Sequence, residues 1–434
     1  MNIRIVFAIL VYGAFCGVGN SAFSQDQIAE NLLNEVQIAL IRGDVELSEK
    51  IVDTLLSHYP DNSQLWYYRG LANRLRMNFS AATMSFRKSL NLDPHNPELY
   101  KQLAQSCYDQ DDYVRCLLYA DSILQTDSLN RNSLKIKGQA LLKLSRYGES
   151  KGSFLKLHQN DSLNTWYIKQ LGGIATKIDS ISEALHWYTL ATEIDSMDMR
   201  SYTHLGSLFV KAELYEEGLP VLTTAIRRDS SHALLFRFRG SLGIMGANFE
   251  QAESDFKTAI QLGDSVAFTF RHYGLCLFKQ SEYQKALKVY KATLKLDPDD
   301  AKAWYYLGFC YKWDEDIEMA IACLDKALIL SASSSISDVY DGLGQFHGFQ
   351  RDYDNAIHNY SRAYEWNPLN PIPLAQIGML VEQSGGKKEH AKNYYKSYLK
   401  KSSHIENAYL IQYVNNRINI INEKLFMEGK LKRD

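Results

Sequence analysis

The segment from residue 301 to residue 334 reads AKAWYYLGFCYKWDEDIEMAIACLDKALILSASS, and its pattern recurs through most of the chain. Its eighth residue, Gly308, has counterparts at one constant interval at Gly138, Gly172, Gly206, Gly240 and Gly274, and Gly70 keeps the same register. A fixed period of about 34 residues that is kept over most of a chain is typical of a stacked-repeat protein. Such arrays bury apolar faces between neighbouring repeats and present extended binding surfaces, so we expect binding rather than catalysis.

Each repeating unit is predicted to form two antiparallel helices of about a dozen residues joined by a tight turn. Apolar residues fall at helical spacing in both halves of the unit, as a half-buried helix requires. Small residues at the eighth and twentieth places, such as Gly308 and Ala320, allow the two helix axes to approach closely. Large residues at the twenty-fourth place, such as Leu324, fill the space beside that contact.

The phrase W-x-x-L-G-x-x-Y at Trp304, Leu307-Gly308 and Tyr311, followed by Ala320, Leu324 and Ala327, resembles the tetratricopeptide repeat (TPR). The resemblance covers nearly the whole chain after residue 24. Together with the targeting segment expected in residues 1–24, it makes the chain resemble an exported bacterial TPR protein. It implies an all-α fold, a right-handed superhelical solenoid of about eleven helix–turn–helix repeats. It also implies that the first helix of each unit lines the concave face, and it implies no particular partner.

The expected repeat array spans residues 25–402, with units that start near residues 29, 63, 97, 131, 165, 199, 233, 267, 301, 337 and 371. The tenth unit follows two extra residues, Ser335 and Ile336. Residues 403–434 are expected to form a capping helix and a basic tail, because the end of an array needs a polar outer surface. A membrane-binding or partner-binding role for this last helix is the alternative.

Residues 1–24 have the pattern of a secretory signal peptide. Arg4 provides a positive start, residues 5–15 are apolar, and Ala22 and Ser24 form the small pair before the expected cleavage point. The alternatives are an uncleaved anchor, or lipid attachment at Cys16. No later apolar run approaches the length that a membrane-spanning helix needs, so no transmembrane span is expected in the mature chain. The protein is therefore expected to be exported to the periplasm or cell envelope.

The overall composition gives little sign of catalysis or nucleic-acid binding. The chain has 48 basic and 50 acidic residues and a net charge of −2, a balance that disfavours whole-surface affinity for nucleic acid. The sequence lacks an HExxH motif, a Walker-type glycine loop and a dinucleotide fingerprint. We therefore expect a noncatalytic protein that carries no cofactor and no metal.

Five cysteines follow the expected cleavage point, and none belongs to a CxxC motif. Cys107 with Cys116, and Cys310 with Cys323, are spaced so that the two members can face each other within one hairpin. The alternative is that all five are buried thiols that pack as small hydrophobic side chains.

The predicted inner face consists of the second, fifth, sixth, ninth, twelfth and thirteenth residues of each first helix. Six such positions in each of the six units from residue 131 to residue 334 give 36 positions, and none is acidic. Eleven are basic: Lys135, Lys143, Lys169, Lys177, Arg200, Lys211, Arg237, Arg271, Lys279, Lys302 and Lys312. A row of cations along one surface attracts an extended anionic ligand. Alternatively, these cations pair with acids on neighbouring second helices.

The candidate binding residues are the basic residues Lys101, Lys135, Lys169, Arg200, Arg237, Arg271, Lys302 and Lys312, together with the aromatic residues Tyr305, Tyr306, Phe309 and Trp313. The aromatic group offers flat apolar contact with a polar rim, which is common in binding hot spots. Its alternative interpretation is that tyrosines are simply frequent at these places of the repeat. Some TPR domains hold a terminal carboxylate with paired asparagines, which this chain lacks.

These features predict a noncatalytic exported scaffold or adaptor whose basic inner face binds an acidic or carboxylate-bearing peptide or protein segment. The alternative is a glycan-binding module of the cell envelope that stacks sugars on the aromatic group. The identity of the partner and the oligomeric state stay open at this level.

Overall fold

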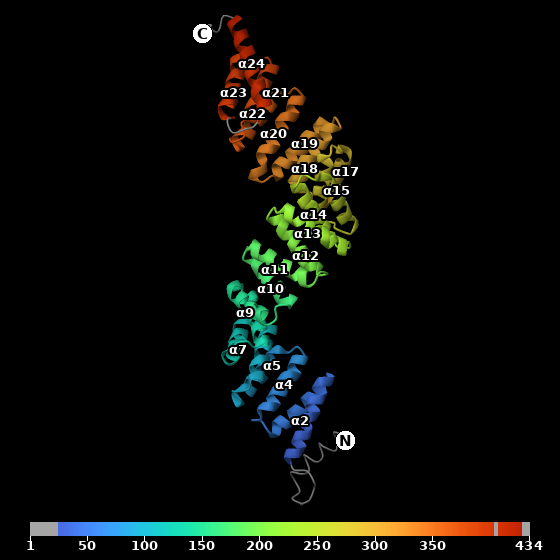
Figure 1. Ribbon diagram of the computed structural model, residues 1–434, viewed down its shortest axis with the longest axis vertical. Helices are drawn as coiled ribbons and strands as arrows, with labels where there is room; N and C mark the ends of the chain where they lie inside the picture. The colour runs from blue at the N-terminus through green and yellow to red at the C-terminus, as the bar shows by residue number, and fades with distance from the viewer. Residues whose placement is uncertain (1–24, 403–406, 428–434) are drawn as a thin grey trace, which may run out of the picture. The chain divides into compact units, whose positions relative to one another are not determined.

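The computed structural model describes residues 25–402 and 407–427, so the expected signal peptide lies outside the described residues. The chain divides into two compact units, residues 1–195 and residues 196–434, which are called unit 1 and unit 2 below. Within each unit the described residues form helices that pack as successive pairs along the chain (Figure 1). The predicted all-α repeat fold is confirmed.

The described part of unit 1 contains five helical hairpins. Its helices are α2 (Gln25–Arg42), α3 (Val45–His58), α4 (Ser63–Leu75), α5 (Phe79–Leu92), α6 (Pro97–Asp109), α7 (Tyr113–Thr126), α8 (Arg131–Lys143), α9 (Tyr147–Asn160), α10 (Thr165–Lys177) and α11 (Ile181–Ile194).

The described part of unit 2 contains six hairpins and a final single helix. Its helices are α12 (Met199–Lys211), α13 (Tyr215–Arg228), α14 (Ala233–Met245), α15 (Phe249–Gln261), α16 (Ala267–Lys279), α17 (Tyr283–Leu296), α18 (Ala301–Trp313), α19 (Ile317–Leu330), α20 (Ser333–Phe349), α21 (Tyr353–Trp366), α22 (Ile372–Gln383), α23 (Lys388–Lys401) and α24 (Ala408–Met427). The first helices from α4 to α18 begin at the same constant interval that separates the recurring glycines.

In several hairpins the core lies where a small residue of the first helix meets a large side chain of the second. A Cβ atom added to Gly138 in α8 would lie 2.8 Å from the ring of Phe154 in α9, and Phe154 is fully buried. The same contact joins Gly274 to the buried ring of Tyr290. In these two hairpins the opposing ring occupies the space that a side chain at the eighth place would need.

The turn inside each hairpin contains one residue in the left-handed backbone conformation, and none of these is glycine from α4 to α21. They are Met77, Asp111, Ser145, Asp179, Glu213, Ala247, Ser281, Glu315 and Arg351, with φ between 56° and 63°. In the first of these turns the Asn78 amide donates a hydrogen bond to the Asn73 carbonyl at 2.9 Å. Such bonds satisfy the carbonyl groups at the end of the first helix and hold the turn.

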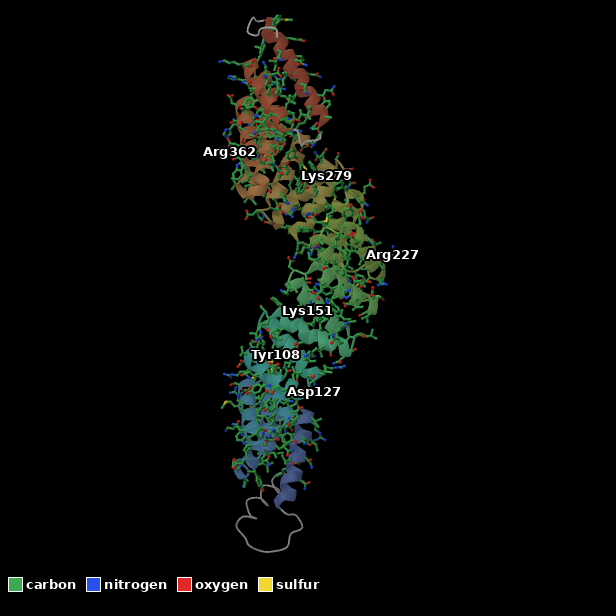
Figure 2. The ribbon with its side chains drawn as sticks, turned by 60° about the vertical axis from the view of Figure 1, so that its left-hand side comes forward. Tyr108, Asp127, Lys151, Arg227, Lys279 and Arg362 are labelled. Carbon is green, nitrogen blue, oxygen red and sulfur yellow. The ribbon has the colours of Figure 1, made fainter. Side chains whose placement is uncertain are left out.

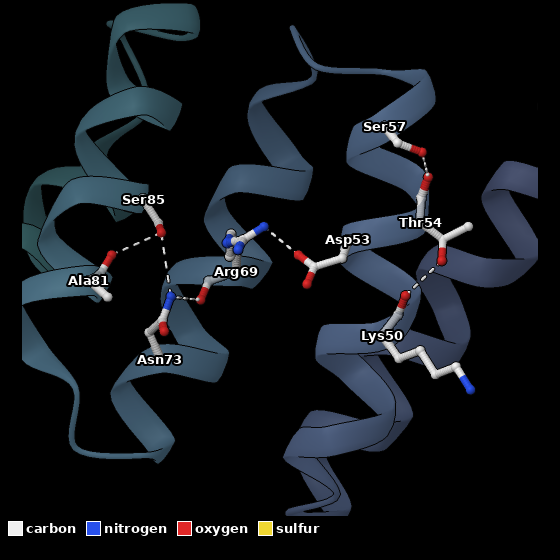
Figure 3. A network of polar contacts seen from close by, with 8 residues as sticks. All are labelled: Lys50, Asp53, Thr54, Ser57, Arg69, Asn73, Ala81 and Ser85. Carbon is white, nitrogen blue, oxygen red and sulfur yellow. Dashed lines mark hydrogen bonds and ion pairs between the residues drawn. The ribbon is translucent and has the colours of Figure 1, made fainter.

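Polar side chains between the helices find partners close by, as the seam around α4 shows (Figure 3). Arg69 of α4 forms an ion pair with Asp53 of α3. Asn73 donates hydrogen bonds to the Arg69 carbonyl at 3.0 Å and to Ser85 Oγ at 3.5 Å, and Ser85 Oγ donates to the Ala81 carbonyl at 2.9 Å. The helices are thus joined by local polar contacts as well as by the apolar core.

Helix α20 begins at Ser333, four residues before the expected start of the tenth unit. The two extra residues, Ser335 and Ile336, lie within this helix and contribute to its length of 17 residues. Nothing in this stretch stops a helix, because it contains neither proline nor the Asp-Pro pair that precedes other units.

The final helix, α24, covers the apolar side of the last hairpin. Val414, Ile421 and Leu425 are buried in one cluster with residues of α22 and α23. Arg417 of α24 pairs with Glu382 of α22, with 2.7 Å between the guanidinium nitrogen and the carboxylate oxygen. No helix in the described ranges is both long and apolar enough to cross a membrane.

All five cysteines of the described chain are free thiols buried in the helical core. They are Cys107, Cys116, Cys276, Cys310 and Cys323. Burial raises the pKa of each thiol, to about 11 for Cys107 and Cys323 and to about 12 for the others. The structure therefore favours the interpretation of these cysteines as packing residues.

Candidate functional site

The inner face of unit 1 contains a cavity of 520 Å³ between α6 and α8. Most of its lining belongs to the places that the repeat register assigns to the inner face. The lining residues are Arg74, Lys101, Gln102, Ala104, Gln105, Tyr108, Ile123, Asn132, Ser133, Lys135, Ile136 and Gln139. Three are basic, four carry side-chain amides, and no carboxylate occurs among the described residues that line the cavity.

The three cations of this cavity have different partners. Arg74 donates a hydrogen bond to the side-chain carbonyl of Gln102. Lys101 lies 3.2 Å from a carboxylate oxygen of Glu98, and both side chains are more than 40 % exposed, so solvent weakens this pair. Lys135 is exposed, and its ammonium nitrogen lies 5.0 Å from the centre of the Trp166 ring.

Despite these contacts, the lining of the cavity keeps a positive charge. A cation–π contact does not use the hydrogen-bond donors of an ammonium group, so Lys135 retains donors for a ligand. Asn132 and Gln139 are also at the surface of α8 and add amide groups beside Lys135. Lys169, the fifth residue of α10, is half-buried and engaged in a contact of its own, and it does not line this cavity.

In unit 2 the corresponding cations are paired, which corrects the expectation of an uncompensated basic row. Arg237 of α14 lies 3.3 Å from the carboxylate of Asp264. Arg271 of α16 lies 2.6 Å from the carboxylate of Asp300. Both carboxylates are almost fully buried, so water screens these pairs far less than the exposed pair in unit 1.

The acids that pair with Arg237 and Arg271 do not lie on second helices. Asp264 and Asp300 precede the next first helix, and Asp300 caps α18 by accepting a hydrogen bond from the Ala303 amide at 3.0 Å. Our sequence interpretation missed them because they lie outside the inner-face places. The signal for Asp300 is its place at the N-cap of α18, where Asp is favoured. Asp264 lies three residues before α16 and accepts hydrogen bonds from the Val266 amide and Thr269 Oγ1.

A second cavity, of 670 Å³, lies on the inner face of unit 2 between α16, α18 and α20. Its lining residues are Arg271, His272, Leu275, Asp297, Asp299, Asp300, Ala301, Lys302, Tyr305, Tyr306, Leu330, Ser331, Ala332, Ser335, Asp338 and Val339. It contains four carboxylates and two basic side chains, so its charge is opposite to that of the cavity in unit 1. Burial lowers the pKa of His272 to about 4, so this imidazole is neutral at pH 7.

The structure separates Trp313 from the other three aromatic candidates. Tyr305 and Tyr306 line the cavity of unit 2, with ring centres 5.2 Å apart and nearly perpendicular planes. Phe309 contacts Tyr305 at 4.9 Å between ring centres and also packs beside the buried Phe346 at 5.0 Å. Trp313 is 56 % exposed, and one face of its ring stacks on Tyr283 at 4.6 Å. Tyr283 and Phe278 lie between Trp313 and the other rings: their ring centres are 5.4 Å apart, and Phe278 also lies 5.4 Å from Tyr306.

The remaining basic candidates differ in exposure. Arg200 and Lys302 are exposed, and Lys302 lines the cavity of unit 2. Lys312 lies between the rings of Trp313 and Phe349, with its nitrogen 4.5 Å from the centre of the Phe349 ring, and desolvation lowers its pKa. Basic and acidic side chains are interspersed over the rest of each unit, as around Arg227 and Lys279 in Figure 2.

Two family models match the chain within unit 2. The model described as TPR repeat matches residues 274–312, and the model described as Tetratricopeptide repeat matches residues 337–368. Both matches fall on helical hairpins of the kind that recur through the described chain. The chain is a tetratricopeptide repeat protein. No curated protein matches it.

Several solved TPR structures resemble parts of the chain. YrrB, a TPR protein with an unusual peptide-binding site, is 24% identical over 41% of this chain and 92% of its own, with a TM-score of 0.37. A chain of the APC/C hetero-tetramer Cut9–Hcn1 is 14% identical over 91% of this chain and 90% of its own, with a TM-score of 0.45. PilF of Pseudomonas aeruginosa is 17% identical over 50% of this chain and 96% of its own, with a TM-score of 0.42. At these identities and scores, the likenesses do not identify a shared function.

The tetratricopeptide repeats described here contain no cluster of three or more His, Cys, Asp or Glu side chains that is able to hold a metal ion. The linings of the two cavities offer charged groups, side-chain amides and aromatic rings.

Proposed function

We propose that the protein is a noncatalytic, exported interaction scaffold whose inner face in unit 1 binds an acidic or carboxylate-bearing peptide segment. The observation that carries the proposal is the cavity between α6 and α8, with its three cations and four amide side chains. Repeat arrays use extended surfaces of this kind to bind other proteins.

The cavity has donors placed along its length for an anionic chain. Lys101 and Lys135 occupy the fifth place of successive first helices, and both are exposed. Each provides a charged donor group, and charged hydrogen bonds are shorter and stronger than neutral ones. The nearby side-chain amides donate to the carbonyl groups of a bound peptide. Glu98 reduces the charge of Lys101 in part, so Lys135 is expected to contribute most.

The proposal is tested by titration calorimetry with an acetylated hexa-glutamate peptide, starting at low salt, about 20 mM. The double substitution Lys101→Gln and Lys135→Gln is expected to weaken binding about tenfold, the order of two exposed ion pairs. Binding by the unaltered protein is expected to fall as salt rises to about 500 mM, because salt screens exposed charges.

The matched control is Lys50→Gln with Lys156→Gln, which removes the same charge from second helices of unit 1. Both lysines are exposed, and the Lys50 side chain extends away from the network drawn in Figure 3. The control is expected to keep the affinity within about twofold. Equal affinities for the two double variants would refute the site in unit 1.

Export is the second part of the proposal and rests on the pattern of residues 1–24. Sequencing of the N-terminus of the protein recovered from its native host is expected to begin at Gln25. A protein that retains Met1 and stays with the cytoplasmic fraction would contradict it.

A further inference from the structure

We propose that the cavity of unit 2 binds a lysine or arginine side chain of a partner peptide. The site is separate from the one in unit 1 and has the opposite charge. It is lined by first helices α16 and α18, by the segment that precedes α18, and by α20.

The fixed charges of this cavity favour a cation. The Arg271 guanidinium is paired with the buried carboxylate of Asp300 at 2.6 Å, so these two charges largely cancel. Asp297, Asp299 and Asp338 form no ion pair within the described part of the chain, and all three are exposed. Lys302 is then the one remaining basic side chain among the described lining residues, against three carboxylates.

The tyrosine rings of this cavity are held in place before any ligand arrives. Tyr306 stacks on the fully buried Tyr290, with ring centres 5.7 Å apart and planes within 10°. Tyr305 stands nearly perpendicular to Tyr306 and also contacts Phe309 at 4.9 Å. Rigid rings beside carboxylates are a suitable environment for an organic cation, because the face of an aromatic ring attracts positive charge.

The size of the cavity distinguishes an organic cation from a metal ion. A volume of 670 Å³ lies within the range of sites for small organic ligands and greatly exceeds the space that a single ion needs. The described residues also contain no cluster of carboxylate, imidazole or thiol groups that is able to hold a metal. A peptide side chain with its flanking backbone is the ligand that fits both the charge and the volume.

The neutral state of His272 supports this inference. Its imidazole is partly buried, and its Nδ1 atom lies 2.7 Å from the Phe268 carbonyl oxygen. Burial lowers the pKa of His272 to about 4, so the imidazole adds no positive charge to the cavity at neutral pH. The net charge of the lining at pH 7 is therefore −2, from four carboxylates, Arg271 and Lys302.

The experiment measures binding of an acetylated, amidated hexa-lysine peptide by titration calorimetry at low salt, about 20 mM. The double substitution Asp299→Asn and Asp338→Asn is expected to weaken binding about tenfold. The matched control, Glu318→Gln with Asp354→Asn, removes two exposed carboxylates of unit 2 outside the cavity and is expected to leave the affinity within about twofold.

A second variant changes the charge in the other direction. Lys302→Glu is expected to raise the affinity for hexa-lysine severalfold, because it replaces the one unpaired cation of the described lining with a carboxylate. Unchanged affinity in both Asp299→Asn/Asp338→Asn and Lys302→Glu would overturn the inference. So would an equal loss in the control pair, which would indicate non-specific attraction to the surface. Neither set of residues affects the hexa-glutamate experiment in unit 1, so the two proposals fail separately.

Discussion

Arg271 and Asp300 lie 2.6 Å apart between side-chain nitrogen and oxygen, and Asp300 also accepts the hydrogen bond that caps α18. One buried carboxylate thus joins two successive repeats and begins the second of them. Arg271, a candidate ligand-binding residue in the sequence, instead stabilises the contact between these repeats.

Replacement of Asp300 by alanine is expected to destabilise unit 2 by about 2–3 kcal/mol. The substitution removes a helix cap, which is worth about 1 kcal/mol. It also leaves the half-buried Arg271 charge without its partner. The control is Asp316→Ala, because Asp316 caps α19 through the Met319 amide at 3.0 Å and has no ion pair within the described residues. It is expected to cost about 1 kcal/mol. Urea titration followed by circular dichroism measures both variants, and equal losses would contradict the role of the ion pair.

A methyl group at the eighth place of a repeat is expected to disrupt the hairpin. In Gly138→Ala the new Cβ would lie 2.8 Å from the buried Phe154 ring, and overpacking of this kind costs about 1–3 kcal/mol. Gly152 lies in the same hairpin with open space around it, and Gly152→Ala is expected to stabilise by about 0.5–1 kcal/mol through helix propensity. Thermal unfolding should therefore shift in opposite directions for these two substitutions, and shifts of the same sign would contradict the packing argument.

The half-buried Asp341 is expected to make unit 2 less stable as pH rises from about 4 to 6. Burial and the nearby Asp338 raise the pKa of Asp341 to about 6, so the folded protein binds this proton more tightly than the unfolded chain. Stability is therefore greatest below the unfolded pKa of about 4 and falls as the carboxyl ionises through pH 6. Asp341→Asn is expected to raise the free energy of unfolding relative to the natural protein at pH 7.5, by up to about 2 kcal/mol, and not at pH 4. A difference that is the same at both pH values would exclude this titration as the cause.

The five core cysteines are expected to resist alkylation in the folded protein. The thiolate is the reactive form, and pKa values of about 11 to 12 leave very little of it at pH 8. Iodoacetamide at pH 8 followed by peptide mass spectrometry should find Cys107, Cys116, Cys276, Cys310 and Cys323 unmodified within minutes, and fully modified in guanidinium chloride. Rapid labelling of any of them without denaturant would show that its hairpin opens, or that its burial is incomplete.

Much of the inner face was predictable once the register of the repeat was known. The lining of the cavity in unit 1 follows the predicted inner-face places, because those places are set by the helical period of each first helix. Lys101 and Lys135 lie in that lining, as does Arg74 at the twelfth place of its helix. The partners of Arg237 and Arg271 were not predictable, because helical periodicity does not determine which side chains meet across a loop.

The sequence by itself determined the all-α repeat architecture, since a small residue that recurs at a fixed interval and apolar residues at helical spacing leave few other ways to bury the core. Only the tertiary structure decided which charges are free. Asp264 and Asp300 lie 27 and 29 residues from the arginines that they neutralise, and folding of the loop before each first helix brings them within reach. The tertiary structure also decided the neighbour of the Trp313 ring, which stacks on Tyr283 of α17.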